Sequence, residues 1–355
     1  MFAERLKRAR TGAKLSLRAM GEKLEISQTA VHKFEQGKLV PESSLLIKWA
    51  KCTGVRLEYF FRPESCELKD VEFRKRTTLP KKVEASIQAD VLDQIERRLE
   101  LNNLFPEPPV SHFKPPAASR VIKTLDDVEA VAEHVRDIWQ LGTNAIPDLI
   151  DVLENQGILV FVNDCDDKRF DGLSGTVEGM PVVVVSSQWP GDRQRFTLAH
   201  ELGHLILHDQ LPETIDEEYA CNRFAGAFLA PKASVQAMIG ERRTGLELRE
   251  LLFMKREFGL SMAASLYRCA DLAIIGKGQK KSLFIRMTQL GLRKQEPEPL
   301  KHETPSLFKH LVYRALGEQF IGESKAAELL GMPVSRFHQL RMMGDQDAAA
   351  VRHQR

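Results

Sequence analysis

Two histidines and a glutamate near the middle of the chain have the spacing of a metal-dependent hydrolase. His200, Glu201 and His204 form an H-E-x-x-H word inside the run Ala199–Leu205, which contains no proline. Histidines four residues apart lie one above the other on one face of a helix, so both imidazoles can bind one zinc ion at about 2.0–2.1 Å. Glu201 is the expected general base, which takes a proton from the water that the metal activates.

A third metal ligand is expected from the carboxylate-bearing segment Asp216–Pro231. The segment predicts a helix that ends near its proline, with an apolar stripe that starts at Cys221 and follows helical spacing. Glu218 precedes Cys221 by three residues and borders this stripe. Glu217 lies almost as close to the stripe, so periodicity does not choose between the two glutamates.

His208 is another candidate ligand, because it continues the four-residue spacing. Two further turns of helix place it about 12 Å along the axis from His200, which is too far for two ligands of one ion. We therefore interpret His208 as an imidazole at the end of the helix, satisfied by local hydrogen bonds.

These residues, together with short sequence motifs on either side of them, resemble those of a known family. The motifs are Phe170–Gly175, Pro181–Ser186, Arg195–His204, Glu218-x-x-x-Asn222-x-Phe224-Ala225 and Leu229-Ala230-Pro231. Over roughly residues 120–290 the chain resembles the ImmA/IrrE family of zinc metallopeptidases. The resemblance implies that His200, His204 and Glu218 bind zinc and that Glu201 is the base. It also places Asn222 where a neighbouring group orients a ligand imidazole through its other ring nitrogen.

Length and composition limit the classes of protein to which the chain can belong. Its 355 residues suffice for two or three domains, and its net charge of +2 restricts any nucleic-acid site to a local patch. Five scattered cysteines in no C-x-x-C spacing argue against a disulfide framework and against a cysteine-based zinc site. The charged N-terminus lacks the apolar core of a signal peptide, and the apolar runs are too short to span a bilayer. We therefore expect a cytoplasmic protein with no membrane partner.

Residues 1–62 have the pattern of a small helical DNA-binding domain. Ser16 and Ser27 are expected to cap two short helices, and Gly37 ends the second of them. The segment, including its Phe34-Glu35-x-Gly37 ending, resembles the lambda-repressor-like (XRE) helix-turn-helix domain. On that resemblance the side of the recognition helix that faces DNA carries Ser27, Gln28, Thr29, His32 and Lys33.

The predicted DNA contacts are of two kinds. Gln28 is a candidate for bidentate pairing with adenine, whereas Ser27 and a set of basic residues are expected to meet phosphates. The basic set is Arg5, Lys7, Arg8, Arg10, Lys14 and Arg18. The alternative interpretation is a plain helical bundle with a solvated basic surface, because helix-turn-helix geometry also serves packing.

The rest of the chain predicts helices around a small sheet. Val83–Leu104 predicts a charged helix with apolar residues spaced by four, which could pack on the peptidase or on a second copy, and a proline-rich stretch follows it. Gly157–Val162 and Pro181–Ser186 predict strands of a small meander, and residues 306–343 predict helices. The predicted fold class is multidomain, with an all-α helix-turn-helix domain, an α+β zincin-like metallopeptidase domain and a helical C-terminal region. The expected segments are residues 1–62 (helix-turn-helix), 63–118 (connector), 119–290 (metallopeptidase) and 291–355 (helical region).

These expectations lead to one principal functional hypothesis and one alternative. The first is a cytoplasmic regulator that binds a double-stranded DNA operator and uses Zn2+ to cleave a repressor- or antitoxin-like protein, with a homodimer as a candidate assembly. The alternative is a non-proteolytic transcriptional regulator or antitoxin whose peptidase-like domain senses a ligand or partner. An intact Glu201 favours the enzyme, because a binding fold does not need a base beside its metal.

Overall fold

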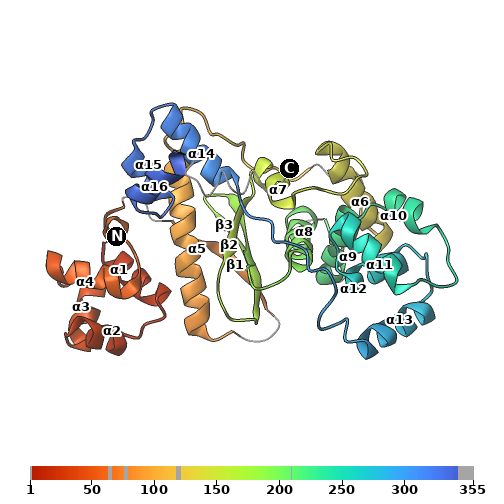
Figure 1. Cartoon of the computed structure of the whole chain (residues 1–355), viewed down its shortest axis with the longest axis horizontal. Helices are drawn as coiled ribbons and strands as arrows, with labels where there is room; N and C mark the ends of the chain where they lie inside the picture. Colours follow the sequence, from red (N-terminus) through yellow and green to blue (C-terminus); the bar gives the residue numbers. More distant parts are fainter. Residues whose placement is uncertain (1, 63–65, 76–78, 117–120, 209, 343–355) are drawn as a thin grey trace. The chain divides into compact units, whose positions relative to one another are not determined.

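The computed structural model describes residues 2–62, 66–75, 79–116, 121–208 and 210–342. Contacts within the chain divide it into two compact units. Unit 1 combines residues 1–69, 78–111 and 306–355, and unit 2 combines residues 70–77 and 112–305. Among the described residues, no helix is long and apolar enough to cross a membrane. The two units are described separately below, with the elements labelled as in Figure 1.

Unit 1 is helical throughout its described part. Its elements are α1 (Phe2–Gly12), α2 (Leu17–Leu24), α3 (Gln28–Glu35), α4 (Ser43–Thr53), the 3-10 helix η1 (Leu57–Phe61), α5 (Lys81–Asn102), α14 (Leu307–Gly317), α15 (Glu323–Leu329) and α16 (Val334–Arg341). The predicted caps are present, because the Ser16 and Ser27 hydroxyls accept hydrogen bonds from the N–H groups of Ala19 and Ala30 at 3.0 and 3.1 Å. The turn between α2 and α3 is tight, since a Cβ at Gly21 would fall 2.8 Å from the Ile26 carbonyl oxygen.

Helix α5 is part of the packing of unit 1, where the sequence predicted a connector. Its apolar residues spaced by four are buried, as the periodicity predicted; they are Ile87, Val91, Ile95 and Leu99. The helix contacts α1 and α14, and the Ser86 hydroxyl donates a 2.7 Å hydrogen bond to the Gly12 carbonyl at the end of α1. Leu101 and Phe105, in and just after α5, join one apolar cluster with α14–α16. The predicted boundaries after residues 62 and 118 fall at segments 63–65 and 117–120, which lie outside the described residues.

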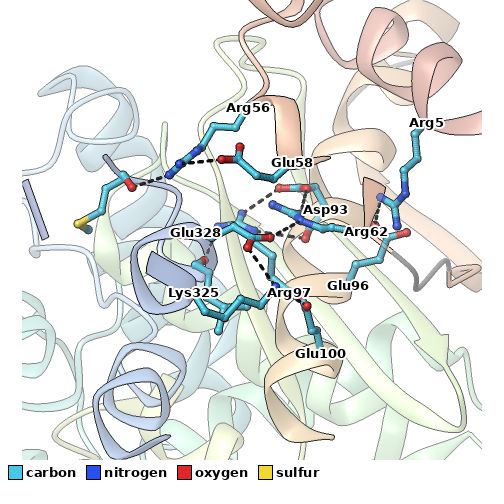
Figure 2. A network of polar contacts seen from close by, with 12 residues as sticks. Arg5, Arg56, Glu58, Arg62, Asp93, Glu96, Arg97, Glu100, Lys325 and Glu328 are labelled. Atoms are coloured by element: carbon cyan, nitrogen blue, oxygen red, sulfur yellow. Dashed lines mark hydrogen bonds and ion pairs between the residues drawn. The ribbon is translucent and has the colours of Figure 1, made fainter. Parts of the chain in front are cut away.

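Buried ion pairs join α5 to the helix-turn-helix segment. Glu96 of α5 accepts hydrogen bonds from Arg5, at 2.8 Å, and from Arg8, and the Glu96 and Arg5 side chains are almost fully buried. Figure 2 shows that this network continues along α5 to the C-terminal helices. Arg62, which directly follows η1, pairs with Asp93 of α5 at 2.6 Å. Glu100 of α5 pairs with Lys325 of α15. Charge pairing therefore links all three parts of unit 1.

The described residues of unit 2 form a four-stranded sheet and eight helices. The strands are β1 (Lys69–Lys75, one residue of which falls in unit 1), β2 (Leu159–Asn163), β3 (Phe170–Val177) and β4 (Met180–Ser186). The helices are α6 (Leu125–Ile138), α7 (Leu149–Asn155), α8 (Gly191–Leu207), α9 (Glu217–Leu229), α10 (Lys232–Ile239), α11 (Leu248–Phe258), α12 (Met262–Asp271) and α13 (Lys277–Gln289). Helices α8, α9 and α6 are neighbours in Figure 1, and their apolar residues belong to one large core cluster.

The sheet differs from the predicted meander in two ways. Its strand order is β1-β3-β4-β2, and β1 was not anticipated from the sequence. Strands β3 and β4 form the expected antiparallel pair, but β2 pairs with β4 in parallel, with Leu159 opposite Val182 and Asn163 opposite Ser186. The physical reason is burial: β4 is an inner strand, and Val182–Val185 are all buried. Such a continuous apolar run suits a strand with neighbours on both edges.

Residues 291–305 belong to unit 2, although the sequence predicted a boundary after residue 290. Several polar contacts hold this segment. Gly191 donates a 2.9 Å backbone hydrogen bond to Leu300, Glu303 pairs with Arg195, and Glu296 pairs with Lys255 at 2.9 Å. The helices predicted beyond residue 306 are present as α14–α16, but they pack in unit 1.

Candidate functional site

The H-E-x-x-H word lies in α8, as its spacing predicted. Helix α8 crosses the core of unit 2, and Leu198, Ala199 and Leu202 on its apolar face are buried. The next helix, α9, starts at the N-cap Asp216, whose carboxylate accepts a 2.8 Å hydrogen bond from the Tyr219 N–H. Its apolar stripe is completely buried, which fixes the helix face; the stripe consists of Cys221, Phe224, Ala225, Phe228 and Leu229. The first turn of α9 consequently faces the two histidines.

Three donor atoms from these helices converge. The Nε2 atoms of His200 and His204 are 3.1 Å apart. Glu218 places one carboxylate oxygen 3.4 Å from the His200 Nε2 and the other 3.3 Å from the His204 Nε2. Ligands of a four-coordinate zinc ion at about 2.0–2.1 Å lie about 3.3 Å from one another. The donor set and its spacing therefore fit a zinc ion, with a fourth position left for water or substrate.

The other ring nitrogen of each histidine also has a partner. The His200 Nδ1 lies 3.1 Å from the Asn222 side-chain oxygen, and the His204 Nδ1 lies 3.0 Å from a Glu217 oxygen. The hydrogen bond from His204 lowers the pKa of Glu217. Partners of this kind fix the tautomer and the ring orientation of metal-binding histidines. Periodicity alone left Glu217 as a possible third ligand. In the structure its carboxylate contacts the Nδ1 of His204.

A second group of possible ligands overlaps the first. His204, Glu217 and Cys221 also place donor atoms within 4.8 Å of one another. This group lacks His200 and uses a cysteine that is completely buried between the helices. His208 belongs to neither group; its side chain is exposed and its Nδ1 lies 3.6 Å from Glu217.

Glu201 is buried, although it is a carboxylate. It follows His200 in α8 and is 4% exposed. A buried carboxylate next to a histidine of the donor cluster is the placement expected of a base that acts on a neighbouring water. Its position therefore agrees with the expected role.

Arg195, Tyr219 and Tyr267 are candidate donors to a developing oxyanion, and the structure separates them. Arg195 is buried and already occupied, because it pairs with Glu303 and donates a 2.8 Å hydrogen bond to the Ile146 carbonyl. Tyr219 and Tyr267 are exposed, and Tyr219 directly follows Glu218 in α9. The two tyrosines thus remain candidates, and Arg195 serves the fold.

The recognition helix predicted in unit 1 is α3. Its predicted DNA-facing residues Ser27, Gln28, Thr29, His32 and Lys33 are all exposed. Val31, on the opposite side of the helix, is completely buried. Ser27 uses its hydroxyl to cap α3, and His32 lies 2.8 Å from Gln36. The helix therefore offers one continuous polar face.

Three of the six basic residues predicted to meet phosphates instead form ion pairs within unit 1. Arg5 and Arg8 pair with Glu96, and Arg10 pairs with Glu35 at 2.5 Å through its Nε. Buried guanidinium groups satisfied by carboxylates cannot also reach a DNA backbone, so the expectation for these three is wrong. The exposed cations of the set are Lys7, Lys14 and Arg18. The arginine pattern was misread because the carboxylate partners lie 25 to 91 residues away in the sequence.

Comparisons with known proteins find a domain in each unit. Residues 153–270 match the model of the IrrE N-terminal-like domain, and residues 1–57 match a helix-turn-helix domain model. The chain joins a helix-turn-helix domain to an IrrE-like domain. The IrrE-like domain holds α8, α9 and the whole donor cluster.

Two relatives match part of this chain. The chain is 32% identical over 103 residues to the radiation response metalloprotease IrrE of Deinococcus deserti, which covers 25% of this chain and 36% of that protein. It is 33% identical over 103 residues to the radiation response metalloprotease IrrE of Deinococcus radiodurans, covering 25% of this chain and 31% of that protein. The matched region thus spans about a third of the length of these relatives.

Proposed function

We propose that the chain is a DNA-binding regulatory zinc metalloendopeptidase that cleaves a repressor- or antitoxin-like protein to control transcription. The observation that carries this proposal is the triangle of donor atoms from His200, His204 and Glu218, with separations of 3.1 to 3.4 Å. The names of the two Deinococcus relatives, both metalloproteases, support the same class of reaction.

Each residue of the cluster has a distinct role in this proposal. His200 and His204 would hold the zinc ion through Nε2, and Glu218 would hold it through its carboxylate. Asn222 and Glu217 keep the two imidazoles oriented through Nδ1. When bound, zinc supplies Lewis acidity, which favours loss of a proton from water and polarises a carbonyl.

Glu201 performs the proton transfers. Its carboxylate accepts a proton from the attacking water, whose oxygen forms a bond to the carbon of the scissile carbonyl. When the carbon–nitrogen bond breaks, Glu201 delivers that proton to the leaving amine. Tyr219 or Tyr267 would donate a hydrogen bond to the oxyanion between these steps.

The helix-turn-helix domain gives the proposed peptidase a regulatory setting. The polar face of α3 would read an operator from the major groove, with Gln28 on a base and Lys33 beside it. Cleavage of a second DNA-binding protein would then change transcription at sites near the bound enzyme. We expect the protein to act in the cytoplasm, where operator and substrate are both present.

The decisive experiment is Glu201→Gln in the full chain. Glutamine has nearly the same shape and leaves the three donor residues intact, so zinc content and DNA binding should stay at the wild-type level. Cleavage of candidate repressors encoded near the protein's own gene, read by mass spectrometry, should fall by about 10²–10⁴-fold. A Glu201→Gln strain with a normal regulatory response would instead favour the non-proteolytic sensor.

A further inference from the structure

A cavity lies beside the donor cluster in unit 2. Its volume is about 940 Å3, and its walls come from α8, α9, α12 and the 293–299 segment. Asn222, whose side-chain oxygen is 3.1 Å from the His200 Nδ1, forms part of one wall. Phe196 forms another part, one turn of α8 before His200. Tyr219 and Tyr267, the candidate oxyanion donors, also line this cavity, so it adjoins the proposed peptidase site.

The wall formed by the 293–299 segment is held firmly. The Glu296 carboxylate accepts hydrogen bonds from the Lys255 ammonium at 2.9 Å and from the N–H groups of Met262 and Ala263 at 2.8 and 3.2 Å. At Gly191 a Cβ would collide with the Lys301 carbonyl oxygen, so the glycine permits the segment to cross α8 closely. A cavity with an anchored wall is largely formed before a ligand arrives, which lowers the entropic cost of binding.

The cavity presents aromatic surface to solvent. Tyr219 is 58% exposed and Tyr267 is 51% exposed, and both line it together with Phe196 and Trp189. Exposing a large aromatic side chain to water costs free energy. In a concave site such side chains provide a stacking surface for a flat apolar group.

The charges of the lining favour an anion. Its three carboxylates already have cations: Asp192 and Glu296 pair with Lys255 at 2.7 and 2.9 Å, and Asp271 pairs with Arg223 at 3.6 Å. Arg293 and Lys294 line the same cavity. Among the described residues, neither has a carboxylate within ion-pair distance. The other cations of the lining are shared among carboxylates, since Lys255 serves both Asp192 and Glu296, so Arg293 and Lys294 are the cations that an acidic group of a ligand can pair with.

The volume of the cavity favours a small molecule over a peptide as its ligand. Small-molecule sites have volumes of about 300–1,000 Å3, and this cavity is near the upper end of that range. A single peptide side chain would leave most of it filled with water, and an extended peptide backbone is better served by a sheet edge. We propose that the cavity is a binding site for a small planar anion, an aromatic ring system that carries one acidic group. The cavity shares Tyr219 and Tyr267 with the proposed peptidase, but ligand binding does not require peptide cleavage, so the test below is independent of the proposed function.

The test uses 8-anilino-1-naphthalenesulfonate, a fluorescent planar anion, with the full-length protein. We expect one saturable site per chain, with the probe displaced by 1-naphthoate and not by the uncharged 1-naphthamide. Lys294→Ala and Arg293→Ala should each weaken probe binding by about two- to fivefold. Arg286→Ala, which removes an exposed cation of α13 outside the lining, is the matched control and should leave the affinity unchanged.

A second pair of variants tests the location of the site. Ala264→Phe would fill the cavity and should abolish probe binding. If the phenylalanine prevents folding, Tyr267→Ser, at an exposed position, tests the same wall of the cavity. Unchanged affinity in Tyr267→Ser and in both cation variants would overturn the proposal. Equal displacement by 1-naphthamide would also overturn it, because charge would then play no part. Tighter displacement by a tetrapeptide with an aromatic and an acidic residue than by 1-naphthoate would reassign the cavity to a peptide.

Discussion

Gly203 of α8 lies directly against Cys221 of α9. A Cβ on Gly203 would fall 3.2 Å from both the Cα and the Cβ of Cys221. Two of the three proposed zinc ligands come from α8 and the third from α9, so this contact sets the distance between them. The glycine in the middle of the H-E-x-x-H word therefore has a packing role of its own.

Gly203→Ala should consequently weaken zinc binding. Alanine improves helix propensity by about 1 kcal/mol, but the clash is with backbone, and overpacking of this kind costs about 1–3 kcal/mol. We expect α9 to shift and zinc affinity to fall at least about tenfold in a chelator competition assay. Gly278→Ala in α13 is the matched control, because a Cβ there meets nothing within 4 Å. It should stabilise the protein slightly, and wild-type zinc affinity in Gly203→Ala would contradict this account of the helix contact.

Local patterns predicted the helices of the site well, because each depends on a few neighbouring residues. The spacing of His200 and His204, the stripe from Cys221 and the caps at Ser16 and Ser27 all reflect helical periodicity or capping. The distinction between Glu217 and Glu218 is of another kind. Both glutamates lie in the first turn of α9, and which of them faces Nε2 depends on the angle at which α9 crosses α8, a tertiary quantity.

Ion pairs and strand pairings between residues far apart in the sequence could not be predicted either. Nothing near Arg5 or Arg8 indicates that Glu96 is their partner, and the basic N-terminal segment therefore looked like a DNA-binding surface. The parallel pairing of β2 with β4 was missed for a similar reason. An apolar run predicts a buried strand, but it does not name the strand's neighbours.

The two glutamates at the start of α9 should differ in their effect on zinc. Glu218→Gln removes the charge of a proposed ligand and should lower zinc affinity more than Glu217→Gln, which removes only the charge of the partner of the His204 Nδ1. For the latter we expect a loss of about 10–100-fold. His200→Ala should lower the zinc content of the purified protein to near background, as measured by mass spectrometry of the metal. Glu213→Gln, at an exposed position before α9, serves as the control. The opposite order of effects would make Glu217 the ligand.

Glu96→Gln should destabilise unit 1 strongly. The Arg5 side chain is 2% exposed and Glu96 is 1% exposed, so the substitution leaves a buried guanidinium without its counter-charge. Breaking such a pair from one side costs about 3–5 kcal/mol. Glu22→Gln breaks the exposed pair with Arg18 and should cost about 0.5 kcal/mol or less. Hydrogen exchange should show faster exchange of α1 and α5 amides in Glu96→Gln only. Equal protection in both variants would mean that the network in Figure 2 adds nothing to the stability of unit 1.

Helix α3 should read DNA with its exposed polar face. Lys33→Ala removes a cation from that face and should weaken binding, whereas Gln28→Ala should chiefly relax sequence preference, by about 1–3 kcal/mol at one base pair. Lys51→Ala removes an equally exposed cation of α4, away from α3, and is the matched control. Sites selected from a random DNA pool by the wild-type chain provide the assay, repeated at two salt concentrations because phosphate contacts weaken with salt.

The two α3 variants test different parts of the interpretation. If Gln28→Ala and Lys33→Ala select the same sites as the wild type with unchanged affinity, α3 is not the recognition helix. If the wild type selects no site even at low salt, the helix-turn-helix domain serves packing, and the proposed peptidase would have to find its substrate without DNA. A loss of preference at one base pair in Gln28→Ala, with the affinity for other sequences unchanged, would identify the base that this side chain reads.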